Sequence, residues 1–169
     1  IYDKIAFAGV GKFSEFDQLR QAGVRHADVK GFNYSREDVD ARSLANAYAQ
    51  SISQTFTHEM KPMEIEILVA EVGATTDQNQ IYQINFDGTV MDKDHLTVLG
   101  GESDVINERL TSAYKENLTL PKAIKAAVGA LAGPDRTLGV DELEVAVLDR
   151  NLPRRAFRRI EGDELSGLL

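Results

Sequence analysis

The spacing of apolar residues predicts a strand followed directly by two helices at the start of the chain. Partial alternation over residues 1–8 indicates a strand that ends in glycines, and apolar residues over 13–29 fall close to a helical stripe, with Gly23 as a weak point. Ser35 and Asp38 form a capping-box pattern that predicts the start of a second helix there. Its apolar residues recur every four positions, at Leu44, Tyr48, Ile52 and Phe56.

Alternating and continuous apolar segments predict a block of strands in the middle of the chain. Residues 64–72 are typical of a strand buried on both faces, and residues 80–86 alternate between apolar and polar. Asp87 and Gly88 form a strong hairpin signal. Further antiparallel strands are predicted over 89–91 and 95–99.

A second pair of helices and two closing strands complete the pattern. Helical spacing over 105–113, and again from Thr119 to Gly133, predicts the two helices. Strands are predicted over 143–148 and 156–160, followed by a short helix from Gly162 onward. Two helix pairs that flank a block of antiparallel strands predict an α+β fold of four layers, an α/β/β/α sandwich.

Composition narrows the class of protein further. The 169 residues are predicted to form a single domain with an ordinary core, since 43% are hydrophobic and 27% are charged. A net charge of −8 disfavours nucleic acid as a partner, because that binding depends on neutralising phosphates. No apolar run approaches the length of a membrane helix, no cysteine is present, and no export signal is visible, so a cytoplasmic protein without membrane contact is expected.

A glycine pattern after the first strand superficially resembles a dinucleotide-binding fingerprint. It consists of Gly9, Gly11 and Ser14, where glycines would let a pyrophosphate approach the start of a helix. A dinucleotide-binding unit also needs a second parallel strand after that helix, and residues 30–35 show none. A structural glycine turn is therefore favoured, and a nucleotide-binding α/β domain stays as a minor alternative.

The sequence shows no known pattern of metal-binding or catalytic residues. Isolated histidines at 26, 58 and 95 do not form a metal-binding pattern, and no nucleophile-elbow motif is present, so neither a metal nor another cofactor is expected. The one concentrated basic feature contains Arg154, Arg155, Arg158 and Arg159. In an acidic chain this segment is predicted to be a solvated strand or a subunit contact, because arginine is favoured at protein interfaces.

Four segments together resemble a proteasome α-subunit of the actinobacterial type. They are GKFSEFDQLR (residues 11–20), SLANAYAQ (43–50), YKENL (114–118) and PRRAFRRI (153–160). The resemblance covers nearly the whole chain. It implies the sandwich fold of the N-terminal nucleophile hydrolases in a subunit without catalytic residues. Such subunits form a seven-membered outer ring that gates substrate entry and stacks on rings of proteolytic β-subunits.

The resemblance also implies one site residue and several partners. In the family, C-terminal tails of activator ATPases insert between neighbouring α-subunits and contact a glycine that matches Gly11. They also contact a lysine upstream of Ile1, and the family has a gating tail, a helix and two strands there. Residues 1–169 are therefore expected to be a single proteasome-subunit domain that is truncated at its N-terminus. The helical segments 13–20 and 41–56 are expected to face the β-ring.

The main alternative is a catalytic β-type subunit of the same fold. A β-subunit carries a glycine-rich loop with a serine that supports its N-terminal threonine. The corresponding residues 132–142 lack that serine, which favours the α-subunit. A processed Thr, Ser or Cys at the N-terminus would favour the enzyme instead.

Overall fold

The computed structural model describes residues 1–169 and divides into two compact units. The first contains residues 1–100 together with 148–157, and the second contains residues 101–147 together with 158–169. The order of elements is the predicted one: a strand, two helices, three strands, two helices and two strands, with a short final helix. The single domain stays a prediction.

An antiparallel sheet of four strands forms the centre of the first unit. Its strands are β1 (Ile5–Gly11), β2 (Ile65–Glu71), β3 (Gln80–Ile84) and β4 (Val90–Asp92), paired in that order. Ile5 lies opposite Glu71 and Gly11 lies opposite Ile65, so β1 pairs with the whole of β2, and β3 pairs with β2 from Ile67 to Glu71. Gly88, with φ of 86°, and Asp87, which accepts from the Thr89 amide, make the predicted turn before β4.

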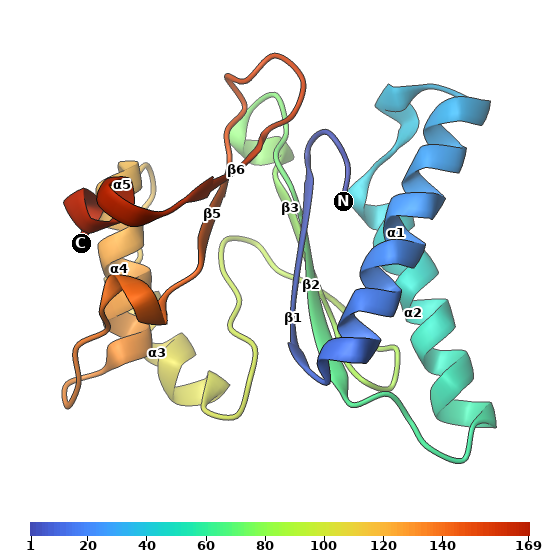
Figure 1. The fold of residues 1–169 in the computed structure, drawn as a ribbon, viewed down its shortest axis with the longest axis horizontal. Coiled ribbons are helices and arrows are strands. Elements are labelled where there is room, and N and C mark those ends of the chain that lie inside the picture. Colours follow the sequence, from blue (N-terminus) through green and yellow to red (C-terminus); the bar gives the residue numbers. More distant parts are fainter. The chain divides into compact units, whose positions relative to one another are not determined.

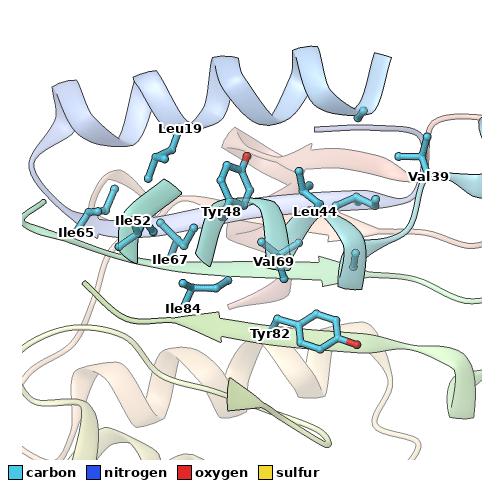
Figure 2. Packing of buried hydrophobic residues seen from close by; sticks show 14 residues of the cluster. Leu19, Val39, Leu44, Tyr48, Ile52, Ile65, Ile67, Val69, Tyr82 and Ile84 are labelled. Atoms are coloured by element: carbon cyan, nitrogen blue, oxygen red, sulfur yellow. The ribbon is translucent and has the colours of Figure 1, made fainter. Parts of the chain in front are cut away.

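Two helices, α1 (Phe13–Asn33) and α2 (Ala41–His58), lie side by side along this sheet (Figure 1). Figure 2 shows Leu44, Tyr48 and Ile52 of α2 next to Ile67 and Val69 of β2. These five side chains are all buried, as the four-residue spacing predicted for α2. Phe56, the fourth member of that stripe, is exposed. Burial of this apolar face holds the helices on the sheet.

Two glycines of α1 make room for tyrosine hydroxyl groups. A Cβ at Gly23 would overlap the hydroxyl of Tyr48, and one at Gly31 would overlap the hydroxyl of Tyr2. Gly23 is therefore a close-packing position in an unbroken helix, and α1 continues past Gly31 to Asn33 instead of ending near residue 29.

Two predicted boundaries and one predicted strand are wrong. The first strand begins at Ile5, because residues 2–5 form a turn closed by reciprocal backbone bonds between Tyr2 and Ile5. Ser35 caps only a 3₁₀ turn, and α2 starts at Ala41, where the Asp40 carboxylate accepts from the Ser43 amide at 2.7 Å. Residues 95–99 form no strand.

The second unit contains three helices and a two-stranded sheet. Its elements are α3 (Ser103–Ala113), α4 (Leu120–Ala132), β5 (Val145–Leu148), β6 (Phe157–Ile160) and α5 (Gly162–Leu168). The end residues Leu148 and Phe157 belong to the first unit. The buried core is small and consists of Ile124, Ile160 and Leu165. No helix is long and apolar enough to cross a membrane.

Candidate functional site at the end of strand β1

Gly11 ends β1, and only Lys12 separates it from the first residue of α1. Its φ of 122° is in the region that favours glycine, and an added Cβ would overlap the carbonyl oxygen of Glu64 on the neighbouring strand segment. Two requirements, the backbone conformation and the close approach of Glu64, therefore exclude a side chain here. The glycine turn predicted from the sequence is confirmed at this residue.

Both the backbone amide and the backbone carbonyl of Glu64 form hydrogen bonds. Its carbonyl oxygen accepts from the Lys12 amide at 2.9 Å, and its own amide donates to Glu15 Oε2 at 2.7 Å. The other carboxylate oxygen of Glu15 lies 3.6 Å from Lys12 Nζ. These bonds join the first turn of α1 to the segment that leads into β2, next to Gly11, which is itself exposed.

The side chains around Gly11, where β1 leads into α1, are exposed and partly apolar. Val10 is exposed, and the Phe13 side chain is 77% exposed, although its ring stacks on Phe16 at a centroid distance of 6.3 Å. Lys61 and Glu64 form an exposed ion pair of 3.1 Å beside it. A peptide segment could thus reach the backbone at Gly11 next to both apolar and charged side chains.

The geometry does not support a nucleotide at the glycines. β1 pairs antiparallel with β2, so the parallel strand pair that a dinucleotide-binding unit requires is absent from the first sheet. The Lys12 amide, which would face a phosphate in such a unit, is already bonded to Glu64. The nucleotide-binding alternative is therefore not supported.

The remaining sequence candidates do not converge on a second site. No three His, Asp or Glu side chains are grouped so that they could hold a metal ion. Arg158 donates to Glu164 at 2.7 Å, and Arg159 lies 3.7 Å from Glu144, which makes both arginines part of exposed ion pairs in the second unit. A role of the arginine segment in a subunit contact stays a prediction.

The helical segments expected to face a neighbouring ring expose some aromatic side chains. Phe13 and Phe56, at the start of α1 and near the end of α2, are exposed, whereas Leu19 and Leu44 are buried against the sheet. Packing within this chain buries only the faces of α1 and α2 that lie against the sheet. The assignment of the outer faces to a contact with β-subunits also stays a prediction.

Comparison with known proteins places the chain in a family. The model of the family described as "Proteasome subunit" matches residues 1–148, and the chain therefore belongs to the proteasome subunit family. It is 55% identical to the proteasome subunit alpha of Acidimicrobium ferrooxidans over 98% of this chain and 71% of that protein. It is 51% identical to the proteasome subunit alpha of Sanguibacter keddieii, over 100% of this chain and 68% of that protein. It is 49% identical to the proteasome subunit alpha of Xylanimonas cellulosilytica, over 98% of this chain and 72% of that protein. The resemblance to actinobacterial α-subunits is confirmed.

The family resemblance pointed to Gly11, whose role stays a prediction, but not to the residue that holds the neighbouring Glu64 peptide. Glu15 was part of the motif at residues 11–20, and an acidic residue in the first turn of a helix is ordinarily explained by the helix dipole. Its partner is the amide of Glu64, 49 residues further along the chain. That pairing depends on the register of β1 and β2, so no local pattern could predict it.

Proposed function

We propose that this chain is a non-catalytic α-subunit of a 20S proteasome core particle. In this function it forms a seven-membered outer ring with neighbouring copies, stacks on a ring of β-subunits and gates the entry of substrates that the β-subunits degrade. The observation that carries the proposal is identity of about half, over nearly the whole chain, to proteins named proteasome subunit alpha.

The second face of the first sheet supports the four-layer sandwich that this function requires. α1 and α2 pack on the face that contains Ile5, Ile67 and Val69. Because side chains alternate along a strand, the opposite face of β1 and β2 presents Glu66, which accepts from Gln83, and otherwise small or apolar side chains that are not fully buried in the chain: Ala6, Ala8, Val10, Leu68 and Ala70. We propose that a second sheet packs on this face.

Gly11 is the proposed contact for the C-terminal tails of activator ATPases. A glycine with an exposed rim lets a peptide backbone approach closely, and the outward positions of Val10 and Phe13 leave the junction accessible. The same glycine is also required by the turn itself. Both roles are compatible, so the experiment must separate docking from folding.

Native mass spectrometry of the full-length protein, alone and with β-subunits, tests the assembly. Rings of seven copies, or a four-ring particle with β-subunits, are the expected result. A small species that ignores β-subunits would contradict the α-subunit function.

Substitution of Gly11 by alanine tests docking. We expect Gly11→Ala to weaken binding of an activator tail peptide to the assembled ring by more than the fall in the melting temperature of the ring would explain. Gly88→Ala is the matched control, because it strains another glycine turn of positive φ, where a Cβ meets the Ala49 carbonyl oxygen at 2.7 Å, away from Gly11. Equal affinity of the Gly11→Ala and wild-type rings would argue against the docking role.

A further inference from the structure

The start of α1 lacks an ordinary cap. Lys12 occupies the N-cap position, and its side chain makes no capping hydrogen bond. The acidic residue of the first turn, Glu15, does not accept from the backbone amide of the N-cap either, but accepts from the backbone amide of Glu64 at 2.7 Å. An acidic side chain that could stabilise its own helix is used instead to hold another segment.

The Glu15 carboxylate and the Lys12 amide together fix the position of the Glu64 peptide. That peptide is the group that a side chain at Gly11 would strike. Only 15% of the Glu15 side chain is exposed, so its bond to the amide is partly shielded from water. The amide-to-carboxylate bond is also charge-assisted, which makes it stronger than a bond between neutral groups.

We propose that Glu15 is a positioning residue of the tail-docking site at Gly11, and this inference rests on the proposed function. By holding the Glu64 peptide against Gly11, Glu15 keeps the backbone of residues 10–12 in the conformation that a tail peptide contacts. Without the carboxylate, the Glu64 amide loses its partner, and the bond from the Lys12 amide to the Glu64 carbonyl is left to hold the peptide against Gly11. Glu15 touches no tail residue in this proposal, so its effect on docking is indirect.

The test measures the affinity of assembled rings for a fluorescent synthetic peptide with the C-terminal tail sequence of the activator ATPase. Glu15→Ala removes both carboxylate oxygens, and we expect the affinity to fall about tenfold, which corresponds to about 1.4 kcal/mol. Glu15→Gln keeps an oxygen that accepts from the Glu64 amide and gives up the charge beside Lys12. Affinity within about threefold of the wild type is expected for it, since the positioning bond remains.

The matched control is Asp17→Ala. Asp17 is an acidic residue of the same helix whose carboxylate bonds only to Arg20 and Gln21 in that helix. Its removal changes the net charge as Glu15→Ala does, without touching Glu64, so affinity should stay at the wild-type value. A fall equal to that of Glu15→Ala would show a general charge effect and overturn the proposal.

Further outcomes separate this inference from the proposed function. Wild-type affinity in the Glu15→Ala ring overturns the positioning role and leaves docking at Gly11 intact, whereas a wild-type ring that binds no tail overturns docking itself. Ring mass and melting temperature are measured on every variant, because a merely structural role would move those. If Glu15→Ala does not assemble, Glu15→Asp takes its place: it keeps the charge but withdraws the carboxylate by one methylene, and wild-type affinity for it would contradict the proposal.

Discussion

The two compact units bury their apolar side chains to very different degrees. In the first unit, α1, α2 and one face of the sheet enclose fourteen buried residues in one cluster. In the second unit, three residues form the buried cluster, and α3 has no buried residue. Because burial of apolar surface is the dominant favourable contribution to folding, the first unit has much more stabilising contact within this chain than the second.

The largest expected effect comes from a cavity in the first unit. Ile67 lies in β2 with 0% exposure, so Ile67→Ala should lower the free energy of unfolding by about 2–5 kcal/mol. Val105 in α3 is 49% exposed, and Val105→Ala should change the free energy of unfolding by less than about 0.5 kcal/mol. Urea denaturation followed by circular dichroism measures both, and hydrogen exchange shows which helices open. A similar loss for both variants would contradict the difference between the units.

Glycine substitutions in two helices sharpen the same comparison. A Cβ at Gly23 of α1 would overlap the Tyr48 hydroxyl, whereas a Cβ at Gly129 of α4 meets no atom within 4 Å. Gly23→Ala should therefore destabilise the protein by about 1–3 kcal/mol through overpacking. Gly129→Ala should stabilise it by roughly 0.5–1 kcal/mol, because alanine loses less backbone entropy in a helix.

The two glycine substitutions are expected to change the stability of the protein in opposite directions. Melting temperatures of the two variants should move in opposite directions from the wild type. A double variant, Gly23→Ala with Tyr48→Phe, removes the overlapping hydroxyl and should recover part of the loss. That hydroxyl is buried without a hydrogen-bond partner, so its deletion costs no bond. Stabilisation by Gly23→Ala alone would show that α1 is loosely packed here.

Much of the fold could be predicted from the sequence, because periodicity reports which face of an element is buried. The stripe of Leu44, Tyr48 and Ile52 predicted α2 and its inner face, and the run over 64–72 predicted β2. Val105 belongs to the apolar positions that predicted α3, and the chain leaves it exposed. Periodicity shows that a helix is amphipathic but not what covers its apolar face.

Boundaries and the site depended on contacts between distant segments. The predicted helical stripe ended near residue 29, yet α1 runs through Gly31 to Asn33, and the Tyr2 hydroxyl occupies the space that a side chain at Gly31 would need. Asp40 rather than Ser35 starts α2, since its carboxylate accepts from Ser43 while it pairs with Lys30. At the site, family resemblance indicated Gly11, but the bond between Glu15 and Glu64 depends on both the register of β1 with β2 and the position of the first turn of α1.

The smallest expected effect concerns the ion pairs of the two units. Lys30 of α1 donates to Asp40, the N-cap of α2, at 2.9 Å. Partial burial tends to raise the pKa of Asp40, but the bonds from Lys30 and from the Ser43 amide outweigh it and hold the pKa below its usual range. A carboxyl group whose pKa is lowered by folding stabilises the protein above its unfolded pKa of about 3.9, and this contribution is lost as the pH falls further.

Asp40→Asn isolates that charge, because asparagine caps a helix about as well as aspartate. We expect the variant to lose about 0.5 kcal/mol of unfolding free energy at pH 7, the size typical of a pair screened by solvent, and to lose less than the wild type on acidification below about pH 4. Glu164→Gln removes the charge of the exposed partner of Arg158 in the second unit. It should lower the unfolding free energy at pH 7 by less than Asp40→Asn does, because Glu164 has no capping bond that already orders its side chain. Urea denaturation at several pH values measures these differences. An Asp40→Asn variant whose stability falls with acid as steeply as that of the wild type would show that the Lys30 pair does not tie α1 to α2, and the contrast between the units would then rest on apolar packing alone.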